Sequence, residues 1–139
     1  VSSIHWSFEP FAFEKGAYIG VKAELKTPMN GADFAKKLET VLGHNVLHAC
    51  PTGAGTIQSI GIITGGANSQ WSVALSDGLD AYITGEMSEH DWNEARESDI
   101  HMFAGGHHAT ERFGVLSLKA LIEKEFEVET VFIDSENPA

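Results

Sequence analysis

The sequence of 139 residues contains one cysteine, few basic side chains and no long run of apolar residues. A single cysteine, Cys50, excludes an internal disulfide and fits a reducing compartment, so we expect a cytoplasmic protein. Only 9 Lys and Arg stand against 20 Asp and Glu, which gives a formal net charge of −11 at pH 7. This charge argues against nucleic acid or an anionic membrane surface as a partner, because both are bound mainly through basic side chains. No segment approaches the roughly 18 apolar residues of a membrane-spanning helix.

Hydrophobic residues make up 42% of the chain, which is enough for a packed core and argues against disorder. The length favours one domain. Residues 1–16 alternate in their aromatic side chains, which predicts an edge strand or, alternatively, an arm that docks on a partner or on a missing domain. Apolar spacing and turn residues predict strands at 17–25, 45–49, 57–64, 80–84, 100–104 and 128–133, and helices at 31–42, 66–76, 88–97 and 107–125.

Predicted strands and helices alternate from residue 57 onward, a pattern typical of βαβ units in a parallel sheet. We therefore predict an α/β fold: a mostly parallel sheet with flanking helices, built from strand–Gly turn–helix units. Residues 1–56 would supply an amino-terminal arm, a strand, a helix and a short strand. Residues 57–139 would supply the parallel units and half of a metal site, and both parts together would form one α/β domain.

Three glycines, Gly65, Gly85 and Gly105, follow successive predicted strands, so the turns should share the sheet edge where open α/β sheets bind ligands. Just past the third glycine, His107 and Glu111 stand four residues apart at a helix start, so that both side chains face the same way. An imidazole and a carboxylate on one helical face suit a divalent ion such as Zn, Mn or Fe. The alternative, an exposed His–Glu pair in a first helical turn, stays open.

A second pair of carboxylate and imidazole, Glu86 and His90, follows the preceding predicted strand, again four residues apart. Glu86 could ligate a metal, accept a hydrogen bond from a metal ligand or act as a general base. An acidic residue at a helix start is also stabilised by the helix dipole alone. For His90 the pattern favours a purely structural role over a functional one. We name Glu86 and His90 as candidate catalytic residues.

Other polar residues carry weaker signals. The segment 64–69 is a glycine turn that enters a helix, but it lacks the G-x-G-x-x-G pattern and the P-loop lysine of strong anion sites. Cys50 has no motif around it and is predicted to be a small buried residue. Trp71 and Trp92 lie in amphipathic helical segments and are predicted to fill the core. Four histidines without ligand spacing are predicted to be structural or exposed; they are His5, His44, His48 and His101.

Three motifs, taken together and in order, resemble one family. They are Thr84-Gly85-Glu86, the run GHHATER from Gly106 to Arg112, and the ending FIDSENPA at 132–139. This combination is similar to the Nif-three-like family, whose bacterial members are known as GTP cyclohydrolase type 2 homologues. The resemblance is close over residues 57–139 and loose over residues 1–56.

The resemblance implies a site with two divalent metal ions, whose identity it leaves open, facing the inner cavity of a toroidal homohexamer. The family's His and Glu ligands map onto His107 and Glu111. An acid that lines the same cavity maps onto Glu86, and a histidine that recurs one helical turn later maps onto His90. Ligation by His108 is not implied, because other residues often occupy that position in the family.

Family chains are about twice as long as this one, and nothing here matches the His-His pair and the Asp ligand of their first half. Val1 is not an initiator methionine, and we expect a C-terminal fragment that is inactive alone, because two ligands are too few for a tight, closed site. The predicted function is one half of a dinuclear-metal hydrolase acting on a nucleotide or a phosphoester, with Glu86 or His90 moving a proton or orienting water. The alternative is a non-catalytic metal-binding scaffold or a regulatory interaction protein.

Overall fold

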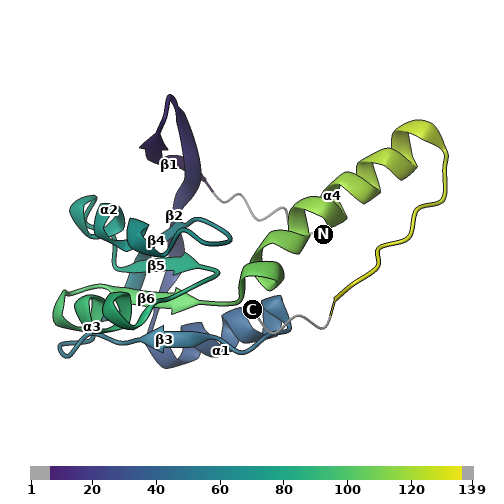
Figure 1. Ribbon diagram of the computed structural model, residues 1–139. Helices are drawn as coiled ribbons and strands as arrows, with labels where there is room; N and C mark the ends of the chain where they lie inside the picture. The colour runs from purple at the N-terminus through teal and green to yellow at the C-terminus, as the bar shows by residue number, and fades with distance from the viewer. Residues whose placement is uncertain (1–6, 136–139) are drawn as a thin grey trace.

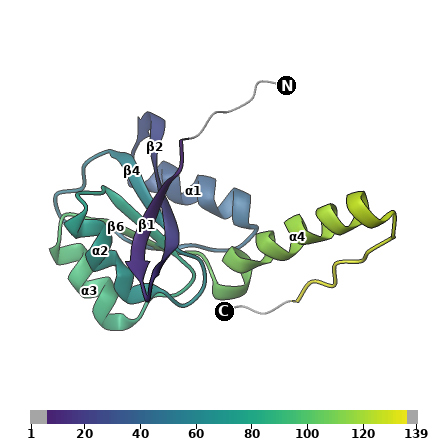
Figure 2. The same cartoon turned by 90° about the horizontal axis from the view of Figure 1, so that it is seen from above.

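The computed structural model describes residues 7–135, which build one six-stranded sheet with helices on both faces (Figures 1 and 2). The strands are β1 (Glu9–Glu14), β2 (Ala17–Met29), β3 (Leu47–Ala49), β4 (Ile57–Ile62), β5 (Ala81–Thr84) and β6 (His101–Ala104). The helices are α1 (Gly31–Leu42), α2 (Trp71–Ser76), α3 (Glu89–Glu97) and α4 (His107–Phe126), with a short 3-10 turn at Asn68–Gln70 before α2. The strand order across the sheet is β1-β2-β4-β5-β6-β3.

The sheet is mixed. The central strands β4, β5 and β6 run parallel to one another, whereas β1, β2 and β3 pair antiparallel with their neighbours. The prediction of a mostly parallel sheet is therefore wrong for the outer strands. Lys15 and Gly16 alone connect β1 to β2, both with positive φ, and so short a turn joins only antiparallel strands.

The aromatic amino-terminal region forms the edge strand that its alternation predicts, although residues 1–6 lie outside the described range. Phe11 and Phe13 keep partners in β2, but Ala12, at a φ of 54°, has none. This left-handed backbone conformation interrupts the alternation of faces along β1 without shifting its register against β2. As a result Phe11 is 1% exposed and packs in the core, whereas Phe13 is 66% exposed.

Hydrophobic side chains fill both faces of the sheet, because successive residues of a strand point to opposite sides. On one face, Tyr82 and Met102 pack with residues of α2 and α3. On the other face, Ile83 and Phe103 pack with Phe34 of α1. Figure 2 shows the same division, with α1 on one side of the sheet and α2 and α3 on the other.

Local signals fix the ends of α1 and the start of α3 close to where the sequence predicts them, whereas α2 begins at Trp71 rather than at residue 66. The Asn30 side chain accepts a hydrogen bond from the backbone N–H of Asp33 at the start of α1, and Gly43 ends this helix at a φ of 62°. Ser88 and Asp91 form a reciprocal capping box at the start of α3. The prediction that both tryptophans fill the core is half right. Trp71 is buried, but Trp92 is 39% exposed, with the Arg96 guanidinium 4.3 Å above its ring.

Helix α4 carries the chain away from the sheet (Figure 1). Only Ala109 and Thr110 in it are buried, and at 1.5 Å per residue the helix is about 30 Å long. The strand predicted at 128–133 is wrong, because the chain leaves α4 far from any sheet edge and runs back beside the helix instead. Val131 and Ile133 are accordingly 78% and 87% exposed. Within residues 7–135, no helix has the length and apolarity needed to cross a membrane.

Candidate functional site

The glycine turns that follow β4, β5 and β6 meet at one edge of the sheet. Gly85 N donates to the Gly65 carbonyl and Gly106 N donates to the Gly85 carbonyl, each at 2.9 Å. The buried Thr110 hydroxyl, in the first turn of α4, accepts from Gly65 N at 3.1 Å and donates to the Gly106 carbonyl at 2.9 Å. The three turns and the start of α4 are therefore one hydrogen-bonded framework.

On this framework His107 lies between two carboxylates. Its Nδ1 is 2.5 Å from Glu86 Oε1, and its Nε2 is 3.3 Å from Glu111 Oε2. The hydrogen bond to Glu86 raises the pKa of His107 above its usual value, and the negative charges of Glu111 and Glu86 act in the same direction. All three side chains are about half exposed, so the cluster is open to solvent.

Two glycines let the backbone come close to this cluster. A Cβ on Gly65 would collide with the Glu111 carboxylate and would lie 3.1 Å from His107 Nε2. A Cβ on Gly85 would lie 2.7 Å from the Gly65 carbonyl oxygen and 2.8 Å from His107 Cα. Residues with side chains would therefore push the turns away from the imidazole, which explains glycine at both positions.

His90, the fourth predicted site residue, does not join the cluster. Its Nδ1 is 3.0 Å from Ser88 Oγ, its Nε2 is 3.5 Å from Asp91 Oδ1, and its side chain is 70% exposed. The buried Asp91 also accepts hydrogen bonds from Trp71 and Asn68. Burial alone would raise the pKa of Asp91, but the hydrogen bonds from Asn68 and Ser88 outweigh it and keep this pKa below its usual value. Asn68 thus donates its hydrogen bond to a buried carboxylate. This argues against an anion-binding site at the glycine turn of residues 64–69.

A hollow of about 510 Å³ adjoins the His107 cluster. Glu86 is in its wall, and the rest of the lining comes from the turns after β5 and β6 and from the segment between α1 and β3. The lining residues are His44, Asn45, Leu47, Gly85, Glu86, Met87, Ala104 and Gly106. One of the predicted catalytic residues therefore faces a space of the size that small-molecule sites occupy.

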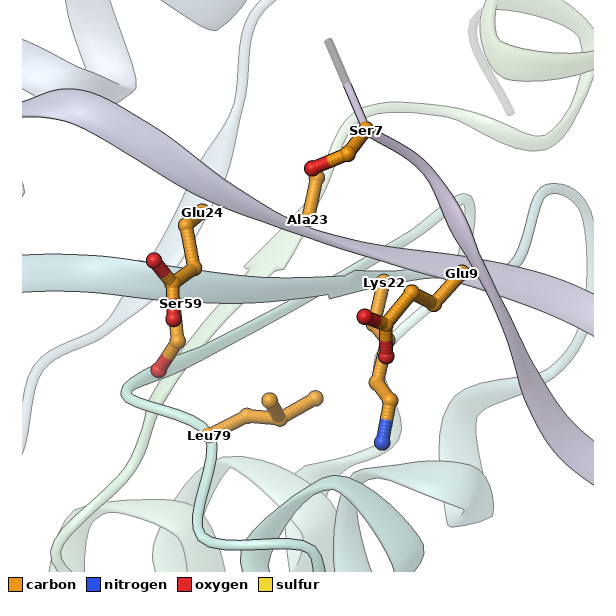
Figure 3. A pocket seen from close by; sticks show the side chains of 7 residues that line it. All are labelled: Ser7, Glu9, Lys22, Ala23, Glu24, Ser59 and Leu79. Atoms are coloured by element: carbon orange, nitrogen blue, oxygen red, sulfur yellow. The ribbon is translucent and has the colours of Figure 1, made fainter.

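A second hollow, of about 370 Å³, lies over β1 and β2 (Figure 3). Figure 3 shows Glu9, Lys22 and Leu79 reaching it from β1, from β2 and from the segment before β5. Lys22 pairs with Asp77 at 3.2 Å. The lining contains no imidazole or thiol and none of the predicted site residues, so it is not a candidate for metal chemistry.

A further group, which sequence reasoning did not assemble, consists of His48, Cys50 and His101. One donor atom from each residue lies within 4.8 Å of the other two, an arrangement that could hold a metal ion. His48 Nε2 is 2.9 Å from His101 Nδ1, and the His48 ring stacks on Phe103 with ring centroids 4.3 Å apart. The signal in the sequence is weak: His48 in β3 and Cys50 just after it are two residues apart, but nothing in the sequence shows that His101 lies on the neighbouring strand.

The two imidazoles of this group are neutral near pH 7. Burial lowers the pKa of His48 to about 4, and the nearby His101 acts in the same direction. Burial also lowers the pKa of His101, although a hydrogen bond with the Gly55 carbonyl and the charge of Asp80 oppose this shift. Neutral imidazole is the form of histidine that binds metal ions.

Comparison with known proteins adds a family and several relatives. A family model described as Duf34/NIF3 (NGG1p interacting factor 3) matches residues 4–138. A Haemophilus influenzae protein named GTP cyclohydrolase 1 type 2 homolog is 45% identical over 127 residues, which are 91% of this chain and 51% of that protein. A protein of the same name from Pseudomonas aeruginosa is 44% identical over 115 residues, which are 83% of this chain and 45% of that protein. The chain thus spans about half the length of the curated relatives it matches.

A solved structure, described as protein ybgI of unknown function, has a similar fold. The TM-score is 0.87 and the sequence identity is 34%, over 96% of this chain and 53% of that one. The mixed α/β architecture described above is therefore shared with that protein.

Proposed function

Because this chain belongs to the Duf34/NIF3 family, we propose that it supplies one half of a dinuclear divalent-metal centre that hydrolyses a nucleotide or another phosphoester. The observation that carries the proposal is the position of His107 between Glu86 and Glu111. The relatives are about twice as long as this chain, and the remaining ligands would come from the part of such a protein that this chain does not include.

The side chains present fit an ion such as Zn²⁺, Mn²⁺ or Fe²⁺. His107 Nε2 and Glu111 Oε2 face each other at 3.3 Å, so both could ligate one ion after little movement. Glu86 accepts a hydrogen bond from His107 Nδ1, which orients the ring and leaves the Nε2 lone pair for the ion. Two donors are fewer than the three or four protein ligands of a zinc site, so we expect weak binding by this chain alone.

The chain's own residues have defined tasks in this proposal. Glu86 holds His107 and, from the wall of the 510 Å³ hollow, would accept a proton from water or substrate. His90, four residues later and open to solvent, would orient water or carry the proton away. A divalent ion at the site supplies Lewis-acid chemistry and lowers the pKa of water.

The charge of the chain bears on the substrate. A net charge of −11 repels a polyphosphate at long range. Arg112 is already engaged, because it donates to the Leu42 carbonyl and to Asp134. We therefore expect the binding of an anionic substrate to depend strongly on the metal ions.

A second candidate function is a non-catalytic metal-binding scaffold or a regulatory interaction protein, and α4 favours it. Beyond its first turn this helix exposes large apolar side chains, a feature that marks interaction surfaces. They are Phe113, Val115, Leu118, Leu121 and Phe126. We infer that this surface is covered in a homo-oligomer, which the family resemblance makes a hexamer.

Metal content is the first test. Elemental analysis is made on this chain and on the full-length parent, each with and without His107→Ala. We expect about two ions per parent chain that depend on this site, in line with a two-metal site, and therefore fewer ions in the variant and in the isolated chain. Glu111→Gln should also lower the metal content of the parent. Glu94→Gln, the same change at an exposed position of α3, is the control and should have no effect.

Turnover then separates the two candidate functions. The metal-loaded parent is assayed on nucleoside triphosphates and on a generic phosphodiester. If the protein is a hydrolase, Glu86→Gln should lower kcat by about 10²-fold, the size of a lost general base. A parent that keeps its metal but turns over none of these substrates would favour the scaffold. Absence of metal from both proteins would rule out the hydrolytic proposal.

A further inference from the structure

His48, Cys50 and His101 lie at the amino end of β6, whereas the His107 cluster follows the carboxyl end of the same strand. We propose that these three residues form a zinc site of their own, with a fourth coordination position open to water or a small ligand. The proposal is independent of the function proposed above, because it uses none of the residues of that site.

The strand register brings the three residues together. Antiparallel pairing of β3 with β6 sets His48 opposite Phe103 and Ala49 opposite Met102. Cys50 follows directly after β3 and continues in the direction of this register, which brings its thiol close to His101. Side chains two residues apart in a strand share a face, so His48 and Cys50 meet His101 on one side of the sheet. That is the face on which Phe103 packs with α1.

Hydrogen bonding prepares His101 as a ligand. Its Nε2 is 3.3 Å from the Gly55 carbonyl oxygen, which only accepts hydrogen bonds. The neutral ring therefore carries its proton on Nε2 and keeps the Nδ1 lone pair on the side of His48. A backbone carbonyl as the outer partner of a histidine ligand is typical of metal sites. The stacking of His48 on Phe103, at an interplanar angle of 15°, fixes the second ring.

The surroundings also suit a cation. A Cβ on Gly31 would lie 2.7 Å from His48 Cε1 and 2.8 Å from His101 Nδ1, so the start of α1 packs on both rings only because this residue is glycine. His101 also borders a hollow of about 270 Å³ whose wall includes Asp80 and Asp99. These acids place negative charge beside His101, which favours a cation nearby.

Two imidazoles and a thiolate select a borderline-soft ion, Zn²⁺ or its analogue Co²⁺, over Mg²⁺ and Ca²⁺. In a tetrahedral zinc site the two nitrogens lie about 3.3 Å apart. His48 Nε2 and His101 Nδ1 are 2.9 Å apart with one proton between them, so the ion takes the place of that proton after a small opening. His48 then carries its proton on Nδ1, and the Cys50 thiol releases one proton to solvent.

A Co²⁺ titration of the reduced, chelator-treated chain tests the site by absorption spectroscopy. We expect a thiolate-to-cobalt charge-transfer band that saturates at a single ion per chain and disappears when Zn²⁺ displaces Co²⁺. Cys50→Ser should lose the band. It should also weaken Zn²⁺ binding by more than about 100-fold, because even the loss of an outer hydrogen-bond partner costs 10–100-fold.

The controls separate this site from the other imidazole cluster. His107→Ala removes an imidazole at the opposite end of β6 and should leave the band and its stoichiometry unchanged. His48→Gln should weaken the band, because the proposal requires an imidazole as well as the thiolate. Zn²⁺ should raise the thermal unfolding midpoint of the wild-type chain but not that of Cys50→Ser. This comparison tests the site even if His48→Gln does not fold.

Three results would overturn the zinc site. The first is a wild-type chain that shows no charge-transfer band although circular dichroism reports a folded protein. The second is a band that survives His48→Gln at full affinity, because Cys50 alone would then bind the ion. The third is a band that depends on His107, which would assign the metal to the other cluster.

Discussion

The two ends of β6 place imidazoles in opposite surroundings. At the carboxyl end, His107 is open to solvent between Glu86 and Glu111, and the hydrogen bond to Glu86 raises its pKa. At the amino end, His48 and His101 pack beside Phe103, and burial lowers both pKa values. One side-chain type is therefore held toward its charged form at one end of the strand and in its neutral form at the other.

This difference shows which physical effect dominates at each end. Where an imidazole is exposed, a carboxylate within hydrogen-bond distance decides its charge state. Where it is partly buried, desolvation decides, and the charge of Asp80 does not overcome it at His101. The surroundings, rather than the residue type, thus determine the charge of the imidazole at each end of β6. Substitutions at the carboxyl end should therefore change hydrogen bonds and charges, and substitutions at the amino end should change the effect of burial.

The largest expected effect is on stability at the carboxyl end. Gly85→Ala would place a Cβ 2.7 Å from the Gly65 carbonyl oxygen and 2.8 Å from His107 Cα, and backbone atoms on both sides leave no room to adjust. We expect a loss of about 3 kcal/mol in the free energy of unfolding, measured by urea denaturation. The matched control is Gly114→Ala in α4, where a Cβ meets nothing within 4 Å. It should stabilise by up to about 1 kcal/mol, and equal effects of the two variants would contradict the close packing at Gly85.

The second-largest expected effect is a loss of stability in acid, caused by His48 at the amino end of β6. The pKa of His48 is about 4 in the folded chain against an ordinary value of 6.5, so below pH 6.5 the unfolded chain binds a proton that the folded chain does not. Stability should therefore be lost as pH falls from 6.5 to about 4, by about 2–3 kcal/mol for this group. Urea unfolding at pH 7 and pH 4.5 measures the loss, and His48→Gln should reduce it. An unchanged acid sensitivity in His48→Gln would contradict the role of burial.

Much of the fold is predictable from local signals in the sequence. Asn30 and Gly43 bound α1, and Ser88 with Asp91 starts α3, because capping depends on neighbours within one turn. The antiparallel pairing of β3 with β6 is not predictable in this way, because it joins segments about fifty residues apart. The strand expected at 128–133 has a suitable pattern, but α4 leads the chain away from any edge that could accept it.

The distinction between local signals and long-range pairing also applies to the candidate site. Residues His107 and Glu111 share one helical turn, and Glu86 follows the neighbouring strand, so spacing and strand order bring these three together. His90 also stands four residues from Glu86, but α3 begins only at Glu89, so the two do not share a helical face and the His90 ring contacts Ser88 instead. The group of His48, Cys50 and His101 depends on register across the sheet, and no spacing rule within one segment detects it.

The smallest effect is a pKa change at the carboxyl end. Glu86→Gln replaces the carboxylate that accepts from His107 Nδ1 by a neutral amide, which stabilises imidazolium less. The pKa of His107 should fall toward its ordinary value of 6.5 while staying above it, because the charge of Glu111 remains. A titration of the imidazole proton resonances by NMR measures this directly, with Glu94→Gln as the control at an exposed acid. In the same spectra the His48 resonance should titrate near pH 4, well below that of His107. Coincident titration of both rings, or no shift in Glu86→Gln, would remove the contrast between the two ends of β6.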